Sequence, residues 1–344
     1  MYVFSEEQNV LRKTAAEVGR TNLTPANGRA SASDDETAAA WSLLHDLGWT
    51  TILLPTDAGG SGGSLVDACI IAEGLAISLA AVPFVAPCVV VPSALELCGS
   101  EANGIGAALV SGSMFSLALN ERLDLPAAGR AVAWDWARDA ILLHVDGRRL
   151  TTVDAPVVPL TSVDVLHPMG RSTVSLRGEA PTDTAVIARL RAVARVANSA
   201  ALTGYAAGAL TMALEHARSR EQFGRSIGSF QALQHLLADM HVAVESSRSV
   251  TYAAAWTTEH LGLADVTRTS ASAFVWCARA AVTTCENAVQ VLGGIGVTEE
   301  SIAHLYLRGA HLLARMFGGE VSALDELARP LIDRARGGGS VEPQ

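Results

Sequence analysis

The chain has 344 residues, of which 49% are hydrophobic and 17% charged, and its formal net charge is -10. This length allows two or three domains with a sizeable core, and an acidic chain without a basic run argues against a nucleic-acid-binding protein. No apolar stretch reaches about 18 residues, and glutamates stand near the N-terminus where a signal peptide needs positive charge. We therefore expect no membrane span and a cytoplasmic location.

Residues 1–108 have the pattern of a helical domain. Ser5, followed by two glutamates and an apolar period, predicts a capped helix start. The glycine cluster at 59–63 lacks the spacing and the Lys-Ser/Thr pair of a phosphate-binding loop, so it predicts a turn. The other expected elements are a loop at 20–34, helices at 36–47, 64–79 and 93–97, and an interrupted segment at 83–92.

Residues 109–181 consist of short apolar runs separated by turn residues, which predicts a small β domain. The Asp146-Gly147 pair between two such runs predicts a hairpin. The expected strands are 115–119, 131–136, 140–145, 150–153 and 172–176.

Residues 182–335 return to a helical period in long segments with short connections, which is typical of an antiparallel four-helix bundle. The expected helices are 185–218, 230–261, 267–292 and 301–316. Residues 336–344 are expected to form a flexible tail. The sequence thus predicts a mostly α protein with a small middle β domain.

Several common catalytic patterns are absent from the sequence. It contains no Glu-x-x-His pair for a di-iron site, no GxSxG and no HExxH. The nine histidines are scattered, and the five cysteines form no CxxC pair and lie in apolar surroundings. We expect buried structural cysteines and no metal site.

The C-terminal half carries a more specific set of residues. Arg220 and Phe223 follow the first long helix, and a guanidinium beside an exposed aromatic can hold a pyrophosphate and stack on a flat ring. Gly293 and Gly294 follow the third helix and allow a ligand to approach the backbone, although singly they also fit a plain helix cap. The candidate cofactor-binding residues are Arg220, Gln222, Phe223, Phe230, Gln231, Gln290, Val291, Leu292, Gly293 and Gly294.

Taken in this order, Arg-x-x-Phe-Gly at 220–224, Gln231, Leu-Ala-Asp-Met at 237–240 and Gln-x-Leu-Gly-Gly at 290–294 resemble the motifs of the acyl-CoA dehydrogenase family. The resemblance implies an N-terminal helical domain, a middle β domain and a C-terminal four-helix bundle. It also implies FAD as cofactor and oxidation of an acyl-CoA to the 2,3-enoyl-CoA. In this reaction a glutamate takes the α-proton, and an electron-transfer flavoprotein is the electron acceptor.

The chain departs from the family where the catalytic glutamate should stand. Alignment on Arg308-Gly309-Ala310 places Phe317 at the usual base position, and the position used by some members falls near Ala194. Glu320 remains as a possible shifted base, or as a solvated glutamate at the start of the last helix. The segment 115–121 also lacks the family's Thr-Glu-Pro flavin-binding motif, and the β domain is shortened.

In the family, FAD lies at a dimer interface, and the retained motifs are those that reach across to the other chain. The resemblance therefore implies a related partner subunit that carries the base, in an α2β2 assembly. It also implies a bulky acyl-CoA of the steroid side-chain type as substrate. Two alternatives stay open: a homomeric dehydrogenase that uses Glu320, and a scaffold without flavin.

Overall fold

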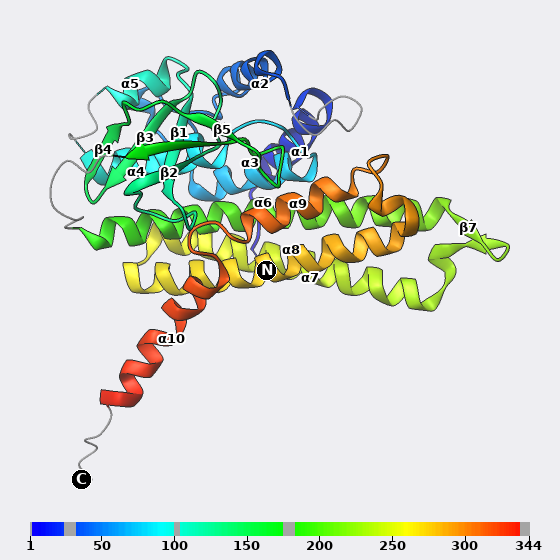
Figure 1. The fold of residues 1–344 in the computed structure, drawn as a ribbon. Coiled ribbons are helices and arrows are strands. Elements are labelled where there is room, and N and C mark those ends of the chain that lie inside the picture. Colours follow the sequence, from blue (N-terminus) through cyan, green and yellow to red (C-terminus); the bar gives the residue numbers. More distant parts are fainter. Residues whose placement is uncertain (1, 24–31, 100–103, 175–182, 338–344) are drawn as a thin grey trace, which may run out of the picture.

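A computed structural model describes residues 2–23, 32–99, 104–174 and 183–337 (Figure 1). Helices come first, a six-stranded sheet follows, and long helices form the last part. The predicted fold class, mostly α with a small middle β domain, is confirmed. The predicted boundary at 181 lies outside the described residues.

The N-terminal part begins three helices in the same way. α1 (Glu6–Val18), α2 (Asp34–Asp46) and α3 (Leu65–Ile77) each follow a serine whose side chain accepts a hydrogen bond from the third helical amide. The side chain of that third residue returns a hydrogen bond to the backbone of the serine, which completes a capping box. The predicted start at Ser5 is confirmed.

Two other predictions for this part were wrong, and one helix was missed. The expected loop at 20–34 is replaced at its start by a π-helical turn, Gly19–Leu23, and at its end by the first residue of α2. The segment expected to be interrupted is a π-helix, Val85–Val90, that leads into α4 (Val91–Cys98), because prolines are tolerated in the first turn of a helix. α5 (Ile105–Val110) was not predicted. The glycine cluster is a turn, as predicted, around a short 3-10 helix, Thr56–Ala58.

The sheet has the strand order β4-β3-β1-β2-β6-β5. β1 and β3 are parallel, and every other neighbouring pair is antiparallel. The hairpin at Asp146-Gly147 is confirmed, since Asp146 pairs with Arg149. β5 was missed because three residues that include a proline give no alternating pattern. The strands are β1 Phe115–Asn120, β2 Gly129–Trp134, β3 Ile141–Asp146, β4 Arg149–Thr152, β5 Val158–Leu160 and β6 Met169–Val174.

The C-terminal part confirms the first three long helices of the predicted bundle. The fourth predicted helix is confirmed as α9, which lies within the predicted range and packs on α6 and α8. The chain then turns into α10, which leads away from the body (Figure 1). The break between α9 and α10 follows from the positive φ angles at Phe317 and Gly318, which lie outside the right-handed helical region. The helices are α6 Thr184–Ser219, α7 Gln231–His260, α8 Leu263–Leu292, α9 Ala303–Leu313 and α10 Gly319–Gly337. Arg336 thus still belongs to α10, and the expected tail from 338 lies outside the described residues.

The N-terminal part is joined to the bundle by buried polar contacts and close packing. The buried Glu73 accepts hydrogen bonds from Tyr252 Oη and Arg248 Nε, both at 2.6 Å. Where α6 crosses α3, a Cβ at Gly204 would lie 2.4 Å from the carbonyl oxygen of Glu73, so only glycine fits. All five cysteines are buried, as predicted. In the described part of the chain, every helix is too short or too polar to cross a lipid bilayer.

Candidate functional site

A small hairpin projects past the end of the bundle between α6 and α7 (Figure 1). It pairs β7 (Glu221–Gln222) with β8 (Arg225–Ser226) and carries Phe223 at its tip. Phe223 is 92% exposed and has a φ of 55°, a left-handed conformation that is uncommon for a bulky side chain. An exposed, fixed aromatic ring with nothing yet packed over it is suited to stacking on a flat ligand.

Phe223 is supported by neighbours from the same segment. Its ring meets that of Phe230 edge-on at 6.2 Å, and the guanidinium of Arg225 lies 4.1 Å above the Phe230 ring. Arg220, at the base of the hairpin, is exposed. Gln222 donates a hydrogen bond to the carbonyl of Glu221 at 2.8 Å, so its amide is partly used within the hairpin. Arg225 was missed from the sequence, because a charged residue in a turn gives no signal of its own.

The second predicted element lies where α8 ends. Gly293 has a φ of 64°, and a Cβ built on Gly293 or Gly294 would meet no atom within 4 Å, so this backbone is open to a ligand. Gln290 is exposed, whereas the side chains of Val291 and Leu292 are buried in the core. Val291 and Leu292 can therefore offer only backbone groups to a cofactor.

Since α7 starts at the hairpin and α8 runs antiparallel to α7, the predicted residues gather at one end of the bundle (Figure 1). Gln231 opens α7, and its Nε2 lies 3.5 Å from His235 Nε2. His235 was not among the predicted residues, although its spacing of four from Gln231 on a helix could have indicated it.

Phe317, which the sequence predicts to stand at the family's base position, lies in the core. Phe317 is fully buried, and its ring meets that of Trp134 edge-on at 5.3 Å. Its amide donates to the carbonyl of Leu123 at 2.6 Å, and its carbonyl accepts from Arg195 Nε at 3.2 Å and Nη2 at 2.9 Å. An aromatic side chain held in this way cannot exchange protons with a substrate.

Arg195 anchors the same region from α6. It is 1% exposed and lies 2.5 Å from Glu326 of α10. Burial lowers the pKa of Arg195, and the opposing charge of Glu326 limits that effect. Its neighbour Ala194, near which the sequence predicts the alternative base position, is fully buried. Neither position presents a carboxylate.

Glu320 lies in the first turn of α10, as one sequence-based interpretation had it, and forms an ion pair with Arg279. The two side chains are 36% and 62% exposed, respectively. A general base for an α-proton needs a desolvated carboxylate, whereas Glu320 is hydrated and paired with a guanidinium.

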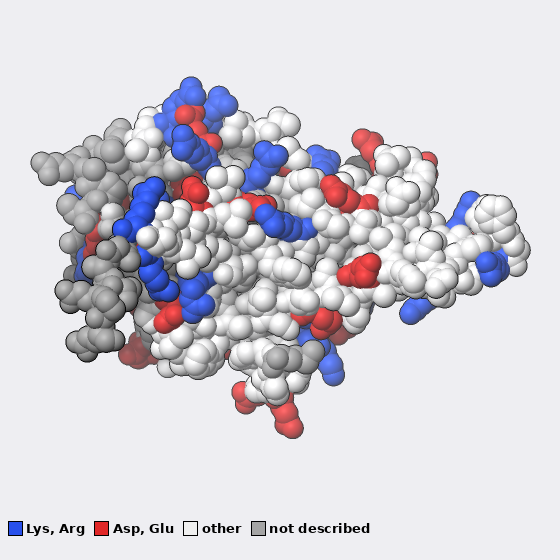
Figure 2. Space-filling model, turned by 90° about the horizontal axis from the view of Figure 1, so that it is seen from below, with Lys and Arg blue, Asp and Glu red and all other residues white. Residues whose placement is uncertain are grey.

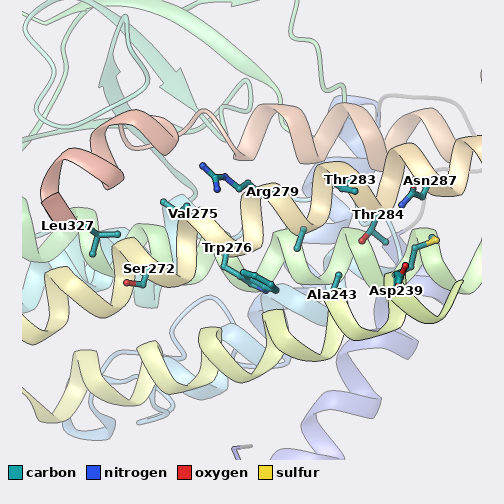
Figure 3. Close-up of a pocket in the computed structure, with 12 residues that line it drawn as sticks. Asp239, Ala243, Ser272, Val275, Trp276, Arg279, Thr283, Thr284, Asn287 and Leu327 are labelled. Carbon is teal, nitrogen blue, oxygen red and sulfur yellow. The ribbon is translucent and has the colours of Figure 1, made fainter. Parts of the chain in front are cut away.

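A cavity of about 510 Å³ lies between α7, α8 and α10 (Figure 3). Its walls include Met240, Trp276 and Leu327, with Asp239 and Asn287 at one end. None of the predicted cofactor residues lines it. Asn287 precedes Gln290 by one helical turn, so the cavity lies on the same face as the exposed end of α8.

Two tryptophans on α7 and α8 are partly exposed: Trp256 and Trp276 are 45% and 47% exposed, and Trp276 lines the cavity. Figure 2 views the molecule from below, toward α7 and α8, and shows Lys, Arg, Asp and Glu gathered on the left, a mostly white stretch toward the right, and Lys and Arg near the projecting tip. Exposed tryptophans are enriched at protein-protein interfaces. Within the described ranges, no group of three or more His, Cys, Asp or Glu side chains is placed to hold a metal ion.

Family models describe residues 5–103 as an acyl-CoA dehydrogenase N-terminal domain and residues 184–331 as an acyl-CoA dehydrogenase C-terminal domain. "Acyl-CoA dehydrogenase FadE34" of Mycobacterium tuberculosis (strain ATCC 25618 / H37Rv) is 31% identical over 342 residues. The alignment covers 92% of this chain but only 46% of FadE34, so the chain spans about half of that relative.

Two solved structures share the fold. A chain of the "ChsE4-ChsE5 complex from Mycobacterium tuberculosis" superposes with a TM-score of 0.81 at 25% identity, over 96% of this chain and 98% of that one. A chain of a "Tcur3481-Tcur3483 steroid ACAD" variant gives a TM-score of 0.81 at 22% identity, over 96% and 99%. The three-part arrangement of this chain is therefore the one found in those structures.

Proposed function

Because the chain belongs to the acyl-CoA dehydrogenase family, we propose that it is one subunit of a heteromeric, FAD-dependent enzyme of this family. It completes the flavin site of a related partner subunit and supplies no base of its own. The partner contributes the catalytic glutamate and most of the pocket for the acyl group. The reaction is the oxidation of an acyl-CoA thioester to its 2,3-enoyl-CoA.

One observation carries the proposal: the residues that would contact a cofactor are exposed, whereas the positions that would carry a base are buried. Arg220, Phe223 and Gly293, which would reach a cofactor in another chain, are exposed at one end of the bundle. Phe317 and Ala194, where a base of this chain would stand, are buried in the core. A chain that only lent its elements to a partner would be under selection to keep the first set and free to lose the second.

The exposed residues fit FAD in kind. The Arg220 guanidinium would hold the pyrophosphate, the Phe223 ring would stack on a flat ring system, and the open backbone at Gly293 and Gly294 would allow close approach. Gln231 and Gln290 would offer amide groups to the ribityl or nucleotide part. When bound, FAD supplies the redox chemistry, and this chain's part is to bind and orient it.

The exposed tryptophans of α7 and α8 support a partner of substantial size. A subunit that reached the hairpin and the end of α8 would also lie over Trp276 and the adjacent cavity, which share one face. Interfaces with a charge-depleted, aromatic centre are typical of stable assemblies. We propose an α2β2 tetramer in which half of the possible flavin sites are used.

We also propose a bulky, steroid-type acyl-CoA as substrate and an electron-transfer flavoprotein as the acceptor. Likeness to a structure described as a steroid ACAD supports the first, and family likeness supports the second. Losing half of the sites leaves room for a large acyl group beside each remaining flavin.

The visible spectrum tests the shared site directly. We expect the purified chain to be colourless, and its complex with a co-expressed, related dehydrogenase subunit that carries the family's glutamate to contain about one FAD per two chains. Reduction of that flavin by an acyl-CoA then identifies the substrate class. A lone chain that is yellow and bleaches with an acyl-CoA would contradict the proposal, and a tight complex without flavin would support a scaffold.

The homomeric alternative depends on Glu320. Because its carboxylate is exposed and paired with Arg279, Glu320→Gln is expected to leave turnover by the complex unchanged and to alter the free energy of unfolding by less than about 1 kcal/mol. Asp325→Asn, an equal change of charge at an exposed site on α10, is the matched control. A large loss of turnover in Glu320→Gln alone would restore Glu320 as the base.

A further inference from the structure

Three buried polar side chains meet where the sheet packs on α6. Asp135 follows β2 and is fully buried, His167 precedes β6, and Tyr205 lies on α6. His167 Nδ1 lies 3.0 Å from Asp135 Oδ1, and His167 Nε2 lies 2.9 Å from Tyr205 Oη. The other oxygen of Asp135 accepts the amide of Ala86 at 3.2 Å, so the N-terminal part is tied to the same point.

A second buried carboxylate completes the cluster. Asp164 Oδ1 accepts the amide of Leu166 at 3.0 Å, while its Oδ2 lies 3.9 Å from His167 Nε2 and has no hydrogen-bond partner among the described residues. Arg308 of α9 faces Asp164 and donates to the carbonyl of Val163. The remaining titratable groups around the cluster are Tyr306 of α9, Cys285 of α8 and Cys88 of the π-helix.

A positive charge on His167 would offset the negative charges of Asp135 and Asp164 in this buried cluster. A buried carboxylate without a nearby cation carries a large desolvation cost, and with a neutral His167 only the Arg308 guanidinium, which faces Asp164, would offset that cost. Burial lowers the pKa of His167, but the hydrogen bond to Asp135 and the charges of Asp135 and Asp164 outweigh it and raise the pKa to about 8. The cation is therefore present at neutral pH and is lost in mildly alkaline solution.

The backbone conformation of Asp135 also indicates that this junction depends on its hydrogen bonds. Asp135 has a φ of 52°, a left-handed conformation that costs free energy in a residue other than glycine. Its two carboxylate oxygens each meet a donor from a different part of the fold, which is what holds the residue there. The junction therefore depends on Asp135 keeping its partners.

We propose that His167 is a proton-dependent clamp between the sheet and α6: while it is charged it holds Asp135, Asp164 and Tyr205 together, and loss of its proton loosens this junction. Because the pKa of His167 is raised in the folded chain, stability should fall as the pH rises. A raised pKa in the folded chain contributes stability that is fully present below about pH 6.5 and is lost as the pH rises through about 8. A rise of the His167 pKa from 6.5 to about 8 corresponds to roughly a 30-fold change in the ratio of folded to unfolded chain.

Thermal or denaturant unfolding of the full chain between pH 6 and 9.5 tests the clamp. We expect the wild-type chain to lose stability mainly between about pH 6.5 and about 8, and His167→Gln to be less stable than the wild type at low pH and flat across this window. His241→Gln, which changes an exposed histidine on α7, is the matched control and keeps the wild-type profile.

Amide hydrogen exchange locates the effect. After correction for the intrinsic pH dependence, protection of β6 should fall above pH 8 in the wild type while protection of α8 does not. If His167→Gln does not fold, Tyr205→Phe keeps the ring, removes one partner of His167 and should shift the midpoint by a measurable amount. A wild-type profile without a transition, or a transition that persists unchanged in these variants, overturns the clamp. Neither measurement depends on flavin, so the outcome is separate from that of the shared site.

Discussion

Arg220→Ala is expected to weaken FAD retention by the assembled complex by about 1.5–3 kcal/mol, or roughly 10- to 150-fold in Kd. The reason is the loss of a charge-assisted contact from an exposed guanidinium at the base of the projecting hairpin. Within the described residues, the hydrogen bonds of Arg220 are those of its backbone, to His216 and Ile227, so the variant should assemble normally. Flavin content after gel filtration, with a fluorescence titration of the released FAD, gives the measurement.

Arg218→Ala is the control for Arg220→Ala, because it removes the same charge from an exposed position in the last turn of α6. The control should keep its flavin, since a general electrostatic attraction would weaken equally in both variants. Phe223→Ala should show an intermediate loss, because stacking on an aromatic ring contributes less than a charged contact. Equal flavin content in Arg220→Ala and Arg218→Ala would remove Arg220 from the site.

The long helices were predictable because their signals are local and repeated. The predicted end of the third bundle helix at Leu292 is confirmed, and the predicted first helix, 185–218, differs by one residue at each end from Thr184–Ser219. The end of the fourth helix was not predictable in the same way. The predicted helix ran to Met316, whereas α9 ends at Leu313, and Phe317 after it has a left-handed φ and packs against Trp134.

Among the candidate site residues, those in short sequence motifs were predictable, whereas those defined by tertiary contacts were not. Arg220, Phe223 and Gly293 were found because each belongs to a short motif. The environment of Phe317 depends on contacts across more than a hundred positions, such as the hydrogen bonds from Arg195, which no motif records. The cluster of Asp135, His167 and Tyr205 was missed for the same reason, since scattered histidines carry no pattern.

The burial of Phe317 supports the proposed division of the site between two subunits. A base at this position would have to be open to the thioester. Here the ring of Phe317 lies against Trp134, and its backbone is hydrogen-bonded to Leu123 and Arg195. Under this proposal, restoring a base at position 317 would require a packed part of the core to open.

Replacing the buried Arg195 tests how firmly that region is held. Arg195→Met is expected to lower the free energy of unfolding by about 3–5 kcal/mol, because it leaves the carboxylate of Glu326 and the carbonyl of Phe317 without their main donor. Arg191 Nη1, 3.6 Å from Glu326, offsets part of this cost, which places the expected value toward the lower end. Denaturant unfolding of the full chain at neutral pH measures it.

Arg279→Met is the control for Arg195→Met, since it breaks an Arg-Glu pair of the same chemistry that is largely exposed. Exposed pairs contribute about 0–1 kcal/mol, so the two variants should differ several-fold in cost. Replacing Glu326 by methionine together with Arg195 should recover much of the loss, because the main penalty comes from an unpaired, partly buried charge and not from the absence of the pair. If Arg195→Met costs no more than Arg279→Met, then Arg195 does not hold Phe317 in place, and the packing of Trp134 and the hydrogen bond to Leu123 must hold it.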